Sequence, residues 1–444
     1  MRIQLSDHFT YGRLLRFVFP SIIMMIFTSI YGVVDGLFVS NFIGKTPFAA
    51  INLIWPYIMG LSVVGFMIGS GGTALISRSL GEGKRERANR EFSLLVYTTI
   101  VIGLAFTVFG LVTMRPVAKL LGAEGELLEI AVVYGRIVVS AQMPFMLQTA
   151  FQTFFITAEK PNLGLGVTVL AGVTNMVLDA LFIAVLGWGA TGAAAATALS
   201  QVVGGLVPLI YFARPNSSLL HLTKTRFDRR TLVQTCTNGA SELMTNLSMS
   251  LVNALYNLQL LKLEGENGVA AYGVIMYANF IFVAIFVGYA IGSAPVVGYH
   301  FGAGNTTELK NLFRKSLTLM AACGITMLVL GFTLAPPLCR LFVSYDAELL
   351  ALTTRGFRLY SLSFLLMGFN IFGSAFFTAL SNGLVSAIIS FLRTLVFQVA
   401  AIMLLPRLLG SSDGVWLSIV TAELLALAVT GWFFAKKRSQ YRYA

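Results

Sequence analysis

The amino-acid sequence predicts an all-α integral membrane protein with twelve transmembrane helices arranged in two six-helix lobes. Three observations predict this fold class: the composition is strongly apolar, long apolar segments recur along the whole chain, and the second half repeats the first. Because each copy holds an even number of spans, we expect a pseudo-two-fold axis along the membrane normal to relate the lobes.

The composition excludes an ordinary soluble domain. Of the 444 residues, 57% are hydrophobic and only 11% are charged, whereas a soluble domain carries about 25% charged residues. An apolar stretch of about 18 residues or more is long enough to cross a hydrocarbon core of roughly 30 Å as an α-helix. The expected spans cover residues 14–40, 49–76, 91–114, 128–158, 163–187, 191–212, 233–261, 270–299, 316–335, 349–380, 384–406 and 414–435.

The 31 Lys and Arg residues are distributed unevenly between the two sides of these spans. If the N-terminus is cytoplasmic, 21 of them fall on the cytoplasmic side, eight on the other side and two within spans. This positive-inside bias predicts a multi-pass protein of a bacterial or archaeal plasma membrane with both termini in the cytoplasm. The net charge of +12 therefore reflects topology and contact with membrane lipid, and we expect no nucleic-acid partner.

An offset of 221 residues aligns the two halves of the sequence without gaps. Self-similarity at one offset indicates a duplicated unit. We therefore divide the chain into a first lobe at residues 1–213, a cytoplasmic linker at 214–232 and a second lobe at 233–444. Two such lobes enclose a central cavity and can rock about it, which is the basis of alternating access. The matched pairs include Gly81 with Gly302, Pro116 with Pro337 and Phe151 with Phe372.

Few ionisable side chains fall inside the predicted spans, and each is a candidate functional group because charge is costly in the bilayer. The acids are Asp35, Asp179, Glu242 and Glu423. We expect functional roles for Asp35 and Asp179, leave the role of Glu242 open, and expect Glu423 to have a structural partner. Arg136 and Arg393 also lie within spans, where they either pair with acids or extend to the membrane surface.

Polar side chains in the fifth and sixth spans follow helical spacing. Asn175 and Asp179 stand four residues apart and share one helix face, as do Thr197 and Gln201. Burial and a nearby second carboxylate both disfavour the charged form of a carboxyl group, so Asp35 and Asp179 together can exchange a proton near neutral pH. The same oxygens, with an amide carbonyl and a hydroxyl, equally suit a hard monovalent cation. The alternative is that these groups only hydrogen-bond helices to one another.

Candidate motifs for catalysis, nucleotide binding and structural metal binding do not meet the requirements of such sites. The sequence GKT at residues 44–46 lacks the glycine that a phosphate-binding loop has five positions earlier, and it follows a span rather than a strand. Cys236, Cys323 and Cys339 are odd in number and form no CxxC motif. We therefore expect no enzyme, no catalytic residue, no cofactor, and no metal apart from a possible Na⁺ at the ion-coupling site.

Five segments, in order along the chain, resemble the multidrug and toxic compound extrusion family. They are VVDGLFVSNFIG at residues 33–44, GEGKRERA at 81–88, NMVLD at 175–179, GAAAATALSQ at 192–201 and GAGN at 302–305. The resemblance covers essentially the whole chain. It implies an exporter whose V-shaped cavity binds amphipathic, often cationic drugs and exchanges them for H⁺ or Na⁺. We expect the protein to act as a monomer.

The resemblance also implies site residues. The first-lobe ion site falls on Asp35, Tyr134, Asn175, Asp179 and Thr197. Pro20 matches a proline at which the first helix bends, and proline removes one helical hydrogen bond. One branch of the family pairs a seventh-span acid with a tenth-span aspartate. Here Glu242 is the candidate for the first, but the tenth span offers only Asn370, which favours coupling through the first lobe.

The substrate cavity should be lined by aromatic, methionine and small polar side chains from both lobes, because adaptable apolar walls accept many shapes. The candidates are Met24, Met25, Met143, Phe145, Met276 and Phe280. The alternative function is a flippase for lipid-linked oligosaccharide precursors, although such proteins usually have more spans and a strongly cationic cavity. A channel would need ligand rings or a continuous polar lining, which the sequence does not indicate.

Overall fold

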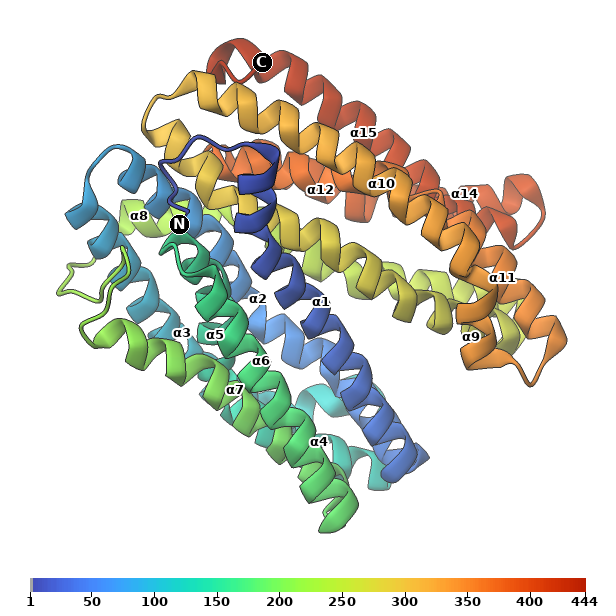
Figure 1. Cartoon of the computed structure of the whole chain (residues 1–444). Coiled ribbons are helices and arrows are strands. Elements are labelled where there is room, and N and C mark those ends of the chain that lie inside the picture. The colour runs from blue at the N-terminus through green and yellow to red at the C-terminus, as the bar shows by residue number, and fades with distance from the viewer. Residues whose placement is uncertain (1–2) are drawn as a thin grey trace.

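The computed structural model describes residues 3–444, apart from the side chains of residues 37, 40, 41 and 45, and consists of helices joined mostly by short connections (Figure 1). Among these residues, nine helices are long and apolar enough to cross a membrane, and two bent helix pairs each pass the same test as one span. One of the nine helices, α9, folds back on itself and supplies two spans. The fold therefore has the twelve spans that the sequence predicts.

The helices form two groups of similar composition. The first lobe contains α1 (Tyr11–Phe42), α2 (Lys45–Gly81), α3 (Arg85–Leu120), α4 (Gly125–Ser140), α5 (Gln142–Thr157), α6 (Pro161–Asp179), the π-helical segment η1 (Ala180–Val185) and α7 (Gly189–Ala213). A short helix, α8 (Arg229–Asn238), follows the connection between the lobes. The second lobe contains α9 (Ala240–Gly302), α10 (Thr306–Val343), α11 (Ala347–Ser361), α12 (Phe364–Ala379), α13 (Gly383–Phe391), the π-helical segment η2 (Leu392–Val396), α14 (Phe397–Leu409) and α15 (Asp413–Tyr441).

Helix α9 is 63 residues long and reverses its direction at Gly265, where φ is 63° and ψ is −146°. The rings of Tyr256 and Tyr272 stack with their centroids 5.1 Å apart. The Tyr272 hydroxyl also donates a hydrogen bond to Asn253 Oδ1 at 2.7 Å. In a straight helix these two rings would lie about 24 Å apart along the axis. The helix therefore consists of two antiparallel spans, the seventh and eighth of the chain.

Irregular features recur at corresponding places in the two lobes. Helices α4 and α5 meet at 55°, and helices α11 and α12 meet at 47°. A π-helical segment interrupts the fifth span after α6 and the eleventh span after α13. The matched prolines Pro116 and Pro337 lie inside α3 and α10. Bends, π-segments and prolines thus follow the duplication that the sequence contains.

The outer faces of the spans are apolar and exposed, which suits contact with lipid chains. On α3 the exposed side chains are Val101, Leu104, Val108, Phe109 and Val112. They recur at the spacing of one helix face, and the small or buried residues of α3 lie between them. These exposed apolar side chains therefore suit contact with hydrocarbon rather than with water.

The two lobes meet at the end of the molecule that carries both termini and diverge toward the other end (Figure 1). At the closed end, glycines allow backbones to touch. A Cβ atom on Gly81 would lie 1.9 Å from the carbonyl oxygen of Tyr299, and one on Gly302 would lie 2.1 Å from that of Arg78. The repeat offset maps Gly81 onto Gly302 and Arg78 onto Tyr299. The two contacts are therefore equivalent across the pseudo-two-fold axis.

The N-terminal segment, residues 3–10, crosses the closed end and contacts both lobes. The Leu5 N–H donates to Glu159 Oε1 of the first lobe at 2.7 Å. The Phe9 N–H donates to Glu308 Oε1 of the second lobe at 2.9 Å, and His8 Nδ1 lies 2.7 Å from Glu308 Oε2. Leu5 and Phe9 are fully buried. This segment ties the lobes together at one end only.

Candidate functional site

Four helices of the first lobe bring together the five residues of the predicted ion site. Asp35 lies on α1, Tyr134 on α4, Asn175 and Asp179 on α6, and Thr197 on α7. Tyr134, Asn175, Asp179 and Thr197 are buried. Asp35 is partly exposed, but its Oδ1 atom is buried. These helices run side by side, so residues far apart in the sequence converge on one point.

The interactions within this cluster link all of its charged groups. The carboxyl groups of Asp35 and Asp179 are near enough to interact with each other. The Tyr134 hydroxyl lies near both carboxyl groups and near the side chain of Thr197. Asn175 stands one helical turn before Asp179 and therefore faces the same side of α6. The cluster is a compact group of oxygen atoms.

The carboxylates of this cluster have no cationic partner among the described residues. Both Asp179 oxygens, Asp35 Oδ1 and Asn175 Oδ1 are buried and receive no hydrogen bond from that part of the chain. Buried polar groups are nearly always hydrogen-bonded, and two unpaired carboxylates together are costly. A proton shared between the carboxyl groups, or a small hard cation held by these oxygens, would supply the missing positive charge.

The local backbone next to this cluster is unusual. The π-helical segment η1 begins directly after Asp179. Such segments are rare and occur frequently at functional sites, because the widened turn shifts the side chains that follow. On α7, Gln201 lies one turn after Thr197, and its Oε1 atom is also buried without a partner. A second unpaired acceptor thus lies one helical turn beyond Thr197 on α7.

Pro20 lies near the contact between α1 and the second lobe. Helix α1 continues through this proline, although proline has no N–H to donate to the carbonyl of Arg16. Two residues further on, a Cβ atom on Gly288 of α9 would lie 2.5 Å from the Cα of Ile22. A bend at Pro20 would therefore disturb the packing of the two lobes.

The six candidates for the cavity wall differ in exposure. Met25, Met143, Phe145 and Met276 are partly buried, Phe280 is 42% exposed, and Met24 is only 1% exposed. The Ser29 hydroxyl donates to the carbonyl oxygen of Phe280 at 3.2 Å, so α1 adjoins the second half of α9 here. Met24 offers almost no accessible surface in this conformation, whereas the other five side chains are at least partly exposed.

The second lobe contains a buried polar network whose members the sequence analysis did not bring together. Glu423 of α15 is fully buried. Arg393 Nε donates to its two carboxylate oxygens at 2.8 and 3.0 Å, and Asn370 Nδ2 donates to Oε2 at 2.7 Å. The Thr430 hydroxyl in turn donates to Asn370 Oδ1 at 2.9 Å. This network carries balanced charge, unlike the first-lobe cluster.

Glu242 and Arg136 take no part in either group. Glu242 is partly exposed near the start of α9, and its carboxyl group has no hydrogen bond or ion pair within residues 3–444. The nearby Gly239 touches α2, since a Cβ atom on it would lie 2.0 Å from the carbonyl oxygen of Met67. Arg136 is exposed on α4 without an ion pair in the same range.

Comparisons with known proteins agree with this architecture. The sequence profile of the MatE family matches residues 20–181 and 243–403, once in each lobe. The chain is 24% identical over 417 residues to "Multidrug export protein MepA" of Staphylococcus saprophyticus subsp. saprophyticus, covering 94% of this chain and 91% of the relative.

Two solved structures have the same fold. The outward-facing conformation of a multidrug resistance MATE family transporter of the MOP superfamily matches with a TM-score of 0.93 at 24% identity, over 100% of this chain and 99% of the other. A MOP superfamily transporter from Pyrococcus furiosus, for which a binding pocket of reverse polarity suggests a different function, matches with a TM-score of 0.91 at 24% identity, over 98% of both chains.

Proposed function

Because the chain belongs to the MatE family, we propose that it is a secondary-active antiporter that exports amphipathic, often cationic organic compounds in exchange for H⁺ or Na⁺. It acts as a multi-pass protein of the plasma membrane with both termini in the cytoplasm. The proposal rests above all on the uncompensated carboxyl pair of Asp35 and Asp179, which suits reversible binding of one positive charge. The name of the staphylococcal relative, a multidrug export protein, supports the substrate class.

With this topology, the closed end of the molecule faces the cytoplasm and the diverging lobes open outward. A proton or Na⁺ arriving from outside then has access to the first lobe while the cytoplasmic end is sealed. One charge moving through 100 mV releases about 2.3 kcal/mol, enough for a roughly fifty-fold gradient of a neutral substrate. Binding of that charge relieves the repulsion between Asp35 and Asp179, so the bound and free states favour different arrangements of α1 and α6.

The second-lobe network supports coupling through the first lobe alone. Arg393 already neutralises Glu423, and Asn370 and Thr430 complete the hydrogen bonds. A cation added here would have to displace a guanidinium group that forms two hydrogen bonds to one carboxylate. Glu242, whose carboxyl group has no partner in the described chain, is the alternative coupling acid.

The alternative function, a flippase for lipid-linked oligosaccharide precursors, would place phosphate groups between the lobes. The first-lobe site carries two acids and, in the part of the chain that the structure describes, no basic partner, which is unfavourable for a phosphate. Deletion of the gene separates the two functions, because a flippase mutant accumulates precursor whereas an exporter mutant accumulates fluorescent drug.

Transport in proteoliposomes tests the coupling site. Asp179→Asn and Asp35→Asn should abolish accumulation of a fluorescent organic cation under separately imposed pH and Na⁺ gradients, because an amide neither takes up a proton nor carries charge. The matched control Glu126→Gln changes an exposed acid of α4 and should transport normally. The gradient that drives the wild-type protein identifies the coupling ion. Normal pumping by both aspartate variants would overturn the first-lobe mechanism and make Glu242 the leading candidate.

A further inference from the structure

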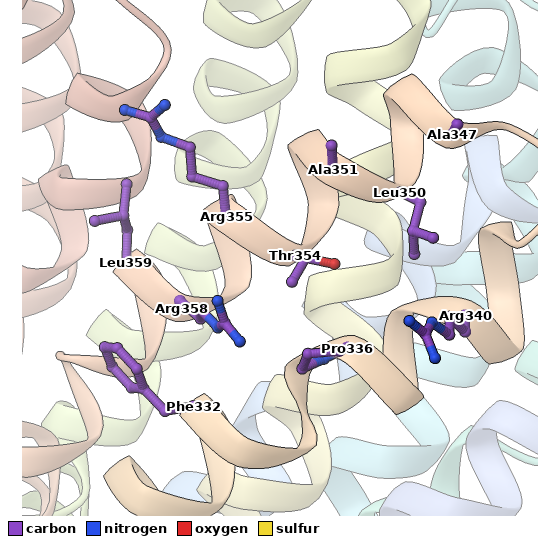
Figure 2. A pocket seen from close by; sticks show the side chains of 10 residues that line it. All are labelled: Phe332, Pro336, Arg340, Ala347, Leu350, Ala351, Thr354, Arg355, Arg358 and Leu359. Carbon is purple, nitrogen blue, oxygen red and sulfur yellow. The ribbon is translucent and has the colours of Figure 1, made fainter.

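A pocket on the second lobe carries basic side chains that the transport cycle does not use. It lies between α10 and α11 and has a volume of about 550 Å³. Phe332, Pro336 and Leu359 contribute apolar walls, and Arg340 and Arg358 contribute guanidinium groups (Figure 2). The pocket therefore combines an apolar surface with positive charge.

The arginines of this pocket differ in whether they have a partner. Arg355 forms an ion pair with Asp413 of α15, and its side chain points away from the pocket (Figure 2). Arg340 and Arg358 form neither an ion pair nor a hydrogen bond with any residue that the structure describes. Their guanidinium groups point toward each other across Pro336 (Figure 2). Two guanidinium groups without an ion-pair partner among the described residues thus line one pocket.

The position of the pocket limits what that anion is. In the proposed topology, on which this step rests, α10 ends and α11 begins at the outer surface of the membrane. Only eight of the 31 basic residues lie on that side, and Arg340, Arg355 and Arg358 are three of them. The positive-inside bias depletes basic residues from outer connections, so it does not account for this cluster.

An exposed apolar stripe leads from the pocket along α10 toward the interior of the bilayer. Ile325, Val329 and Phe332 are all exposed, and together with Pro336 they recur at the spacing of one helix face. A molecule with its anionic group between Arg340 and Arg358 could therefore lay a hydrocarbon chain against this stripe.

We propose that the pocket binds the phosphate group of an anionic phospholipid of the outer leaflet, with an acyl chain along the α10 stripe. Arginine suits this ligand, because its planar guanidinium group forms paired hydrogen bonds with phosphate oxygens. Basic pockets between membrane helices are recurrent binding sites for lipid head groups. The paired Arg355 contributes to the local potential, and Asp413 neutralises most of its charge.

Native mass spectrometry of the full chain in detergent tests this site without any transport step. The protein is titrated with phosphatidylglycerol and with phosphatidylcholine of identical acyl chains. The wild-type protein should prefer phosphatidylglycerol, and Arg340→Gln/Arg358→Gln should weaken its binding about tenfold or more while leaving phosphatidylcholine binding unchanged. The control Arg407→Gln removes an exposed arginine of α14 outside the pocket and should keep the wild-type preference.

Three results would overturn the proposal. The first is equal binding of the two lipids by the wild-type protein, and the second is an equal effect of the double variant and of Arg407→Gln on lipid binding. The third is competition by inorganic phosphate at the concentration of the lipid, which would indicate a site for soluble anions. Unchanged phosphatidylcholine binding shows that the double variant is folded. Because the assay measures binding only, its failure is distinguishable from a failure of ion-driven export.

Discussion

Glu423 and Asp179 are both buried acids, but they should respond oppositely to replacement by the corresponding amide. Glu423→Gln leaves the guanidinium group of Arg393 without a counter-charge, and that side chain is only 14% exposed. Removing one partner of a buried ion pair typically costs about 3–5 kcal/mol. Glutamine still offers Asn370 and Arg393 one acceptor oxygen, so we expect a loss near the lower end, about 3 kcal/mol.

A double-mutant cycle separates this charge effect from the loss of packing. Arg393→Met alone leaves the fully buried Glu423 carboxylate unpaired and should destabilise the protein at least as much as Glu423→Gln. The combination Glu423→Gln/Arg393→Met removes both charges, and replacing a buried pair by groups of similar volume is often nearly neutral. Two single losses of about 3 kcal/mol each and a nearly neutral double variant give a coupling energy of about 6 kcal/mol in favour of the double variant.

Denaturant melts of the purified variants in detergent measure these stabilities, with Asp179→Asn as the contrasting protein. Asp179 has no cationic partner to lose, and an asparagine amide can donate a hydrogen bond to Asp35. Asp179→Asn should therefore unfold no earlier than the wild-type protein, although we expect it not to transport. The reasoning fails if Asp179→Asn is as unstable as Glu423→Gln, or if the double variant is no more stable than either single variant.

Two further predictions concern the closed end of the molecule. Gly81→Ala places a methyl group where the Tyr299 carbonyl oxygen lies and should shift the lobes apart at that end. Distances between spin labels on the two lobes measure this shift. The control Gly60→Ala, at a position where nothing lies within 4 Å, should leave these distances unchanged. Glu308→Ala removes the acceptor of Phe9 and should free the N-terminal segment, so trypsin should cleave after Arg13 several-fold faster. An unchanged cleavage rate would show that this segment does not depend on Glu308.

The fold could be predicted from the sequence because membrane spans depend on the length and composition of apolar segments. Every expected span has a helical counterpart, since lipid leaves the backbone no other way to satisfy its hydrogen bonds. The sequence analysis did not predict where the helix pairs bend. The fourth span breaks between α4 and α5 at Ala141, three residues before Pro144. Proline has no N–H to bond the carbonyl of Ser140, where α4 ends, so the signal for this break was present in the sequence.

The first-lobe cluster could also be predicted from the sequence, because two of its members share a helix face and the remainder followed from family resemblance. The second-lobe network could not be predicted in this way. Glu423 lies 30 residues from Arg393 and 53 residues from Asn370, and their meeting depends on how each helix is rotated in the lobe. The signal was present in the opposite charges of Arg393 and Glu423 within neighbouring apolar spans, since buried charges are rarely left unpaired.

Helix α1 connects the features on which the proposed cycle depends. The N-terminal segment that ties both lobes leads directly into it, Ile22 contacts Gly288 of the second lobe, and Asp35 lies about 20 Å further along the same helix. A continuous helix transmits displacement along its axis. In the proposed cycle, a displacement of Asp35 on ion binding would therefore shift the Ile22 contact. Pro20 lies between that contact and the N-terminal segment, so a bend at Pro20 would let α1 move at the site while its start remains fixed.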